Sequence, residues 1–256
     1  MRGPFIVPFR CYKEKKMLDR FDDQPILRNS SATQAWDVDA GLRNYMMKVY
    51  GYMAMGLGLT GVVSFLTASS PAFFHAIFGT PLAWVVIFAP LGMVLFLSAK
   101  ISSLSLSTAQ TLFWVYAGTM GLSLSSIFYM YTGQSIARLF FVSASVFAAM
   151  SLYGYTTKKD LTNFGSFLMM GLIGLVIASV VNLFLQSTAL QFGLSCIGVL
   201  VFTGLTAYDT QMIKELYFES DSIEVAGKKA IIGALNLYLD FINLFLSLLR
   251  IFGDRR

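Results

Sequence analysis

Two aspartates lie inside long apolar stretches of this chain, and their type and position offer the clearest chemistry in it. Asp209 occurs in GLTAYDTQMIK and Asp240 occurs in GALNLYLDFINLFLSLLR. A carboxylate at membrane depth costs on the order of 3 kcal/mol or more, so such groups usually pair or line a path for ions or protons. Because the two occupy consecutive apolar stretches, we predict one site whose function depends on protonation.

Two carboxyl groups that meet in a poor dielectric do not both ionise easily, so they share a proton and titrate as a unit. The protonated pair forms a hydrogen bond that can hold two helices together, whereas the doubly ionised pair repels itself or attracts a cation. Calcium takes about six to eight oxygen ligands. Asp209 and Asp240, with nearby amide, hydroxyl and backbone oxygens, therefore predict weak calcium binding and no other cofactor. The alternative is that each aspartate makes a structural hydrogen bond to Asn, Thr or Tyr.

A polar stripe accompanies the second aspartate. At 100° per residue, Asn236, Asp240, Asn243 and Ser247 fall on one face of a helix whose other faces are apolar. Such a helix should lie centrally, with its polar face toward a cavity or another polar helix. The side chains predicted to support the pair are Asn236, Asn243, Thr206 and Tyr208.

The elements that position these residues are membrane-spanning helices. The chain is 56% hydrophobic and 13% charged, whereas a soluble domain has about 25% charged residues. Only helices satisfy the backbone in lipid at this segment length, so the fold is an all-α transmembrane bundle. The predicted domains are a polar, disordered cytoplasmic tail, 1–44, and a transmembrane domain, 45–253. The predicted spans are 45–67, 82–99, 110–131, 137–156, 164–186, 190–213 and 230–252, with a charged connection over 214–229.

The basic residues predict how the chain is oriented. With a cytoplasmic N-terminus, fifteen of the 19 Lys and Arg residues fall on the inside and four on the outside. This distribution follows membrane topology and argues against a nucleic-acid-binding face. Seven spans place the C-terminus outside, although the terminal GDRR leaves a re-entrant last segment as an alternative. The segment PFIVPF is too short for a cleavable signal.

Small residues predict where helices approach one another closely. Ala54 and Gly58 have small-xxx-small spacing in the first span, and Gly171, Gly174 and Ala178 follow one another along the fifth. We interpret both sets as helix-packing features.

Three segments resemble a known family. AYDTQMIK and LYLDFINLFLSLLRIFG resemble the signature of the Bax inhibitor family of transmembrane proteins, and SLYGYTTKKDLTNFGSFLMMGLIGL is similar to its bacterial members. The resemblance covers roughly residues 40–253. It implies a seven-helix bundle with the last helix surrounded by the other six. It also implies a pH-sensitive calcium leak, not an enzyme, with Asp209 and Asp240 as proton sensor and gate.

The resemblance carries further expectations. Some members have an arginine near the end of the second helix that bridges to the first aspartate. Here that region reads FLSAKISSLS, so Lys100 is the nearest cation, and a lysine lacks the bidentate fork of arginine. The expected partners are the lipid bilayer, calcium ions and, since bacterial members are implicated in regulating them, membrane proteases or other membrane proteins. The expected location is the bacterial inner membrane, crossed several times.

Three other functions compete with a leak channel. An intramembrane aspartyl protease also has two aspartates on consecutive helices, and Tyr208-Asp209 fits its first motif. Its second aspartate follows Gly-x-Gly, whereas Asp240 follows Leu237-Tyr238-Leu239, where leucine obstructs the approach of a substrate backbone. A coupled transporter usually has inverted repeats and broken helices, which are not apparent. A non-transporting regulator that binds other membrane proteins remains an alternative, in which the acids are structural.

Overall fold

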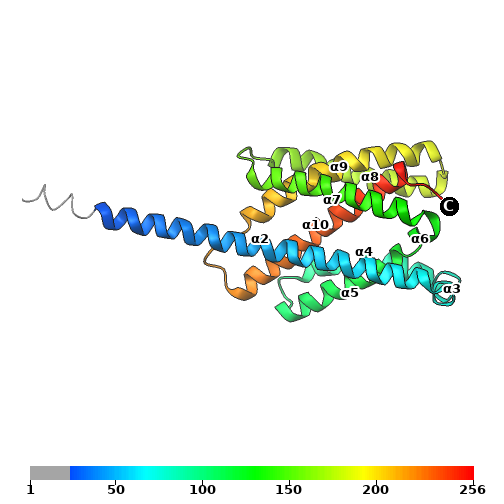
Figure 1. Ribbon diagram of the computed structural model, residues 1–256, viewed down its shortest axis with the longest axis horizontal. Coiled ribbons are helices and arrows are strands. Elements are labelled where there is room, and N and C mark those ends of the chain that lie inside the picture. The colour runs from blue at the N-terminus through cyan, green and yellow to red at the C-terminus, as the bar shows by residue number, and fades with distance from the viewer. Residues whose placement is uncertain (1–23) are drawn as a thin grey trace, which may run out of the picture. The chain divides into compact units, whose positions relative to one another are not determined.

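The computed structural model describes residues 24–256, with side chains from residue 40 onward, and all of its regular elements there are helices (Figure 1). Seven of them are long and apolar enough to cross a membrane. This confirms the predicted all-α membrane fold with seven spans. The helices are α2 (Gln24–Ser69), α3 (Pro71–Phe78), α4 (Leu82–Lys100), α5 (Leu106–Leu124), α6 (Ile127–Met130), α7 (Gly133–Thr156), α8 (Thr162–Leu185), α9 (Thr188–Glu215) and α10 (Ile223–Phe252).

Two segments are more helical than the sequence predicted. Helix α2 begins at Gln24, so helical structure extends into the segment 1–44 that was expected to be disordered, while residues 1–23 lie outside the described part. Pro25 fits the first turn of a helix, where its missing N–H is not needed. The predicted connection over 214–229 is also too long, because α9 continues to Glu215 and α10 already begins at Ile223.

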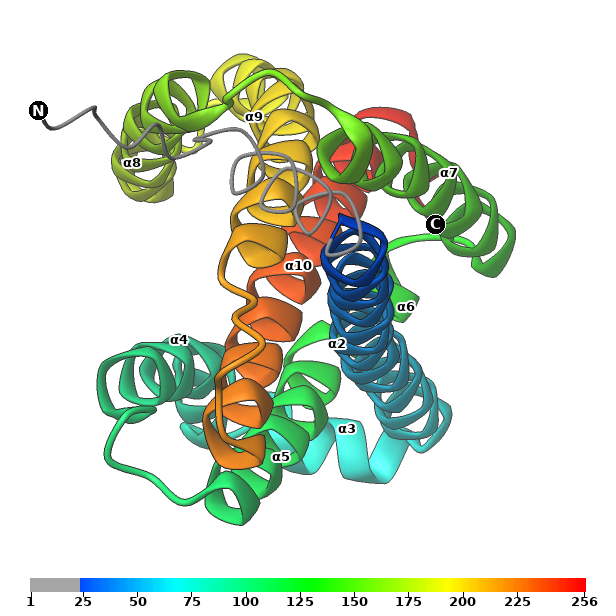
Figure 2. The ribbon, with the colours of Figure 1, turned by 90° about the vertical axis from the view of Figure 1, so that its left-hand side faces the viewer.

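Helix α10 is the core of the bundle, as predicted. In its most apolar window 72% of the residues are buried, against 6% to 33% in the other six spans. Figure 1 shows α10 crossing obliquely between α7, α8 and α9 on one side and α4 and α5 on the other. Figure 2, turned by 90°, agrees, with the neighbouring helices arranged around it. Along its 30 residues α10 is one continuous helix, which is about 45 Å and enough to cross in a single pass. A continuous helix of this length favours a single crossing over the re-entrant alternative.

Hydroxyl side chains begin several of the helices. Ser105, Thr132, Ser187 and Ser222 each accept a hydrogen bond from the backbone N–H three residues later, at the start of α5, α7, α9 and α10. These caps satisfy backbone donors that a helix leaves free at its first turn. The four spans therefore begin at positions that local sequence specifies.

One glycine fixes the spacing of α7 and α9. A Cβ on Gly154 would meet the backbone of Ala207, so only glycine allows the two helices to approach this closely. The close approaches predicted at Gly58 and Gly174 are wrong, since nothing lies within 4 Å of a Cβ at either position. Spacing in one helix does not reveal which face meets another helix, and these two glycines face away from their neighbours.

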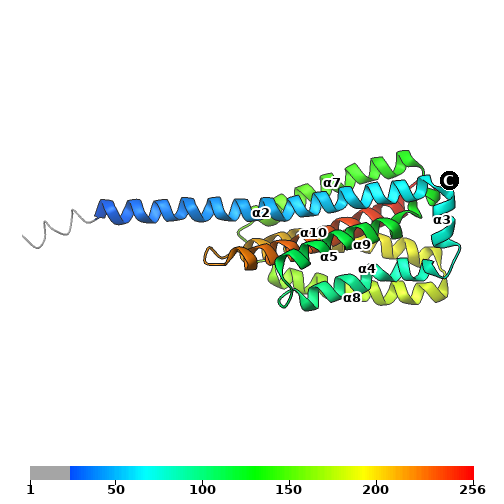
Figure 3. The same cartoon turned by 90° about the horizontal axis from the view of Figure 1, so that it is seen from below.

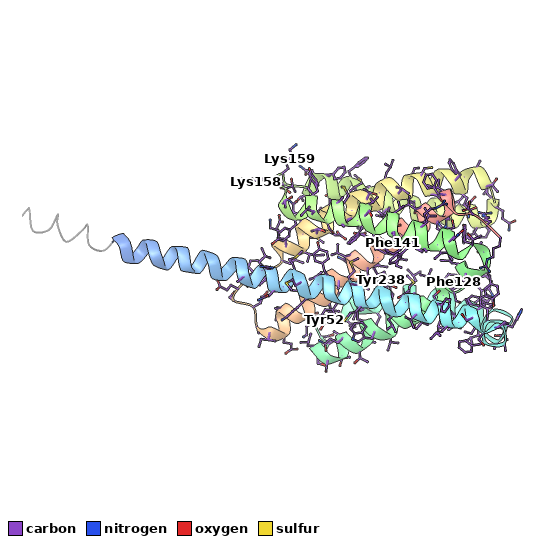
Figure 4. The ribbon with its side chains drawn as sticks, in the orientation of Figure 1. Tyr52, Phe128, Phe141, Lys158, Lys159 and Tyr238 are labelled. Carbon is purple, nitrogen blue, oxygen red and sulfur yellow. The ribbon has the colours of Figure 1, made fainter. Side chains whose placement is uncertain are left out.

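A buried hydroxyl pair connects α10 to two other spans. The Tyr238 hydroxyl lies 2.7 Å from Thr60 Oγ1, and Thr60 Oγ1 donates to the Ala117 carbonyl at 2.8 Å. Figure 4 shows Tyr238 in the middle of the bundle, and Figure 3 shows α5 and α10 running beside each other. Because Tyr238 is fully buried, this polar contact fixes the rotation of α10 about its axis and hence the direction of Asp240.

The last residues of the chain fold back onto α6 and α7. The Thr132 N–H donates to the Asp254 carbonyl at 3.0 Å, and the Arg256 N–H donates to the Met130 carbonyl at 3.1 Å. Arg138 pairs with the Asp254 carboxylate at 3.3 Å on the exposed surface. These bonds hold the C-terminal end of α10 in place.

Candidate functional site

Asp209 on α9 and Asp240 on α10 are neighbours and line the same cavity. Asp240 is 4% exposed and Asp209 is half-buried. Asp209 is six residues before the end of α9 and Asp240 is seventeen residues after the start of α10. The two aspartates are neighbours although they lie at different numbers of residues from the α9–α10 turn, because α10 crosses the bundle obliquely (Figure 1).

No N–H or O–H donor among residues 40–256 is in hydrogen-bonding position to Asp240 Oδ2, although this oxygen is buried. Asp209 is next to Asp240 in this cavity, and its carboxyl group donates a hydrogen bond only when it carries a proton. No Asn, Thr or Tyr among residues 40–256 donates a hydrogen bond to this oxygen, so it gives no support to the alternative in which each aspartate makes a structural hydrogen bond. A buried carboxyl oxygen without a protein donor is costly unless a proton or cation satisfies it.

The pair opens into a cavity of about 430 Å³ between α8, α9 and α10. Three of the four residues predicted to support the pair line it, namely Tyr208, Asn236 and Asn243. No lysine or arginine of the described residues lines it. The remaining lining side chains are apolar and come from Met169, Leu172, Phe202, Leu205, Met212 and Leu239.

Two predicted residues do not reach this cavity. The Thr206 hydroxyl is fully buried and donates to the Phe202 carbonyl, one turn earlier in its own helix, at 2.8 Å. Lys100 ends α4, is exposed and forms no ion pair with any residue between 40 and 256. The cavity therefore has two carboxyl groups and no compensating cation from the side chains of residues 40–256.

The cavity also contains amide oxygens. Asn243 donates from Nδ2 to the Leu239 carbonyl at 2.8 Å, which leaves its side-chain oxygen available. Asn236 lies one turn before Asp240, on the same face of α10. Within residues 40–256, no group of three or more His, Cys, Asp or Glu side chains gathers around a point. Two carboxylates and two amide oxygens supply part of a calcium shell of about six to eight ligands, which fits transient rather than tight binding.

Gln211, two residues after Asp209, has a role that the sequence did not reveal. Its Oε1 accepts from the Leu161 N–H and its Nε2 donates to the Lys159 carbonyl, both at 2.8 Å. Lys214 donates to the Tyr155 carbonyl at 2.9 Å and lies over the Tyr155 ring. The motif AYDTQMIK therefore holds the α7–α8 turn on α9 beside the aspartate pair. The sequence feature that could have indicated this role is a long polar side chain, Gln211, about one turn before the end of an apolar helix.

The α7–α8 turn carries charges outside the spans. Figure 4 shows Lys158 and Lys159 at this turn, at the edge of the bundle. Asp160 Oδ1 accepts from the Thr162 N–H at 2.8 Å. Hydrogen bonds from the Thr162 side chain and backbone lower the pKa of the Asp160 carboxyl below its ordinary value. The turn is therefore fixed by α9 on one side and by a local carboxylate contact on the other.

Comparison with known proteins decides the family. A profile of the family described as "Inhibitor of apoptosis-promoting Bax1" matches residues 42–256. The chain belongs to the Bax inhibitor family. It is 55% identical over 218 residues to RP147 of Rickettsia prowazekii, an alignment that covers 85% of this chain and 92% of the relative. It is 51% identical over 220 residues to the inner membrane protein YbhL of Escherichia coli, which covers 85% of this chain and 94% of YbhL.

A third relative, from Caulobacter vibrioides, is 47% identical over 229 residues, and the alignment covers 86% of this chain and 92% of the relative. The family resemblance predicted from the two aspartate motifs is thereby confirmed. As a member of this family, the protein is a multi-pass membrane protein, and the seven apolar helices agree with that assignment.

Proposed function

We propose that this protein is a pH-sensitive calcium leak channel in which Asp209 and Asp240 share a proton and act together as sensor and gate. The observation that carries the proposal is a pair of carboxyl groups in a cavity that no lysine or arginine of the described residues lines. Without a protein cation, the cost of two buried charges falls only if the pair holds a proton or takes up a cation. A proton-controlled cation path requires a site that can hold either a proton or a cation, and this pair meets that requirement.

The proton and the cation compete for the same oxygens. With a proton between them, the carboxyl groups form a hydrogen bond that joins α9 to α10. When the proton leaves, the two carboxylates repel each other and attract a divalent cation, to which Asn236 and Asn243 add oxygens. Because this shell falls short of the about six to eight oxygens that calcium prefers, the ion is held weakly enough to leave, as conduction demands.

The residues before Asp240 support a leak channel over an intramembrane aspartyl protease. Leu237 and Tyr238 are fully buried in packing contacts, and Leu239 lines the cavity. An extended substrate backbone needs open space beside the second aspartate, which glycine supplies and these side chains fill. We therefore propose no catalytic role for the pair.

We further propose that the protein resides in the bacterial plasma membrane with a cytoplasmic N-terminus. The Escherichia coli relative is an inner membrane protein, and the excess of basic residues on one side of the spans supports this orientation. In this orientation Asp209 lies toward the cytoplasmic end of α9, since Glu215 ends that helix on the inside.

The proposal is tested with purified protein in liposomes that enclose a calcium-sensitive dye. Calcium entry is followed in a series of buffers of increasing pH, because the coupled pair is expected to release its shared proton in one step. We expect flux that changes with pH through one transition. In Asp209→Asn or Asp240→Asn, the amide donates permanently to the remaining carboxylate. Each variant should therefore lose the transition and keep, at every pH, the flux that the wild type has at the acid end.

The matched control is Glu219→Gln, which removes an acidic charge from the exposed α9–α10 turn. It should keep the wild-type pH profile. Absence of flux, or flux that neither aspartate substitution alters, contradicts the proposal and favours a non-transporting regulator of membrane proteases or stress-response partners. Cleavage of a model transmembrane peptide that either substitution abolishes would instead indicate a protease.

A further inference from the structure

A second cavity, of about 390 Å³, lies near the C-terminal end of α10 and differs in chemistry from the aspartate cavity, which lies near the middle of that helix. It is formed by the end of α8, the α8–α9 turn, the start of α9 and the last turn of α10. Arg250 is its one charged lining residue, and no acidic side chain lines it. Its other lining residues are Ser179, Asn182, Leu183, Gln186, Ser187, Gln191 and Leu194.

The guanidinium and amide donors that line this cavity form no hydrogen bond with any residue between 40 and 256, whereas the Ser179 hydroxyl donates to the Leu175 carbonyl. Among residues 40–256, Arg250 forms no ion pair, whereas Arg138 at the same end of the bundle pairs with Asp254. The amides of Gln186 and Gln191 donate no hydrogen bond within the same range. Asn182 Oδ1 accepts from the Ser187 N–H at 3.1 Å, so the amide donor of Asn182 is also available. The cavity therefore offers a guanidinium and three amides to one ligand.

The backbone adds to this positive character. Helix α9 begins at Thr188, directly after Ser187, which lines the cavity. The first N–H groups of a helix lack intrahelical acceptors and form the positive end of its dipole, which favours an anion. The left-handed Gln186 turn places this helix start beside the end of α8. A planar guanidinium and a helix start together match the oxygens of a phosphate group.

The surroundings of the cavity resemble the boundary between lipid headgroups and chains. Arg250 lies in the last turn of α10, near the end of a span. Leu183, Phe184 and Leu185, at the end of α8, are largely exposed and apolar. A phosphate in the cavity would therefore have hydrocarbon-compatible surface directly beside it, as the headgroup of a phospholipid does.

We propose that this Arg250 cavity binds a phosphate group, held by the Arg250 guanidinium, the amides of Asn182, Gln186 and Gln191, and the start of α9. The ligand chemistry is a phosphate anion, from either an anionic phospholipid headgroup or free phosphate. Arg250 lies ten residues after Asp240 along α10, which is about 15 Å. It is independent of the proposed proton-sharing pair.

The test uses the full-length protein in an uncharged detergent. Phosphatidylglycerol, phosphatidylcholine with the same acyl chains, or inorganic phosphate is titrated while the unfolding temperature is measured, and bound lipid is counted by native mass spectrometry. We expect saturable stabilisation by phosphatidylglycerol but not by phosphatidylcholine. Arg250→Gln should weaken the apparent affinity about tenfold or more, as expected for loss of charged hydrogen bonds. Arg250→Lys should retain part of it, because a lysine keeps the charge without the fork.

Arg255→Gln is the control, since it removes the same charge near the same end without lining the cavity. It should bind as the wild type does. Gln191→Leu removes a cavity amide and no charge, and it should also weaken binding. This variant tests the site if Arg250→Gln does not fold. Stabilisation by inorganic phosphate alone, lost in Arg250→Gln, would support the site with a soluble ligand. Binding that is unaffected by Arg250→Gln, or equally reduced by Arg255→Gln, would overturn the proposal.

Discussion

At the scale of single residues, the decisive feature is a buried carboxyl oxygen that has no donor among the described residues. Asp240 is next to Asp209, and from residue 40 onward the cavity around them is lined by amide groups but by no lysine or arginine. In most buried ion pairs an opposite charge offsets the cost of desolvation. Here that compensation has to come from a proton or from a bound ion, so the properties of the site depend on what the solution supplies.

The Asp160 carboxyl gives a prediction about pH and stability. Hydrogen bonds from Thr162 lower its pKa, so the folded state binds this proton less readily than the unfolded state does. Its stabilising contribution is complete at neutral pH and is lost as the pH falls through the lowered value. We expect the unfolding temperature of Asp160→Asn to lie below that of the wild type at neutral pH and to converge with it toward about pH 3. A difference that persists unchanged in acid would contradict this.

Residue chemistry explains which site residues the sequence predicted. The helical period placed Asn236 and Asn243 on the face of Asp240, and all three line the cavity. Thr206 was misplaced because a threonine hydroxyl inside a helix often bonds to the carbonyl one turn earlier, which removes it from a site. Gln211 was missed because its partners are backbone groups of a turn about 50 residues away, which no local pattern records.

At the scale of elements, helix ends were harder to predict than helix existence. The charged stretch before α10 reads as a loop, yet Ser222 caps the helix and Glu224 pairs with Lys228 at 2.8 Å across one turn. Such pairs stabilise a polar helix start that emerges from the membrane. Hydropathy detects only the part of a helix that lies in lipid, so it shortened α10 by seven residues.

Gly154 gives a prediction about helix spacing. Gly154→Ala adds a Cβ that meets the backbone of Ala207, so α7 and α9 have to separate. We expect this substitution to lower the free energy of unfolding by about 1–3 kcal/mol, as overpacking does. Gly174→Ala is the control, because nothing lies within 4 Å of its added Cβ. Chemical or thermal unfolding in detergent measures both, and equal stability of the two variants would count against the close approach.

Gln211 gives a prediction about the α7–α8 turn. Gln211→Leu removes both hydrogen bonds that hold the backbone at Lys159 and Leu161. We expect faster amide hydrogen exchange across residues 157–162 by about tenfold or more, since each lost bond contributes roughly 1 kcal/mol. Gln134→Leu, at an exposed position early in α7, should leave exchange in the turn unchanged. Equal protection of the turn in Gln211→Leu and the wild type would show that other contacts hold it.

At the scale of the whole molecule, the compact unit from Tyr45 to Arg256 is organised around one helix. The central place of α10 was predicted from its narrow polar stripe. A helix that is apolar on its other faces is expected to be surrounded by other helices, with its single polar face toward a cavity. The partners of that helix were not predictable, since every other span is apolar on most sides. Contacts such as Thr60 with Tyr238 depend on tertiary packing alone.

The seven spans give a prediction about topology. In a variant with serines at Cys11 and Cys196, Ser220→Cys lies in the α9–α10 turn and Arg255→Cys lies in the last segment. We expect a membrane-impermeant maleimide to label Arg255→Cys from outside intact cells and Ser220→Cys only in inverted membranes, because basic loops stay inside. Labelling of both positions from the same side would contradict a single crossing by α10.

The claim on which the whole account depends is that Asp209 and Asp240 hold one proton between them. Infrared spectroscopy of the purified protein in lipid, recorded across a pH series, follows the C=O stretch of protonated carboxyl groups directly. We predict one pH-dependent transition of this band in the wild type that is absent from the same pH series in both Asp209→Asn and Asp240→Asn, because the amide takes the place of the shared proton and donates to the remaining carboxylate. A transition that survives in either variant, or its absence from the wild type, would contradict it.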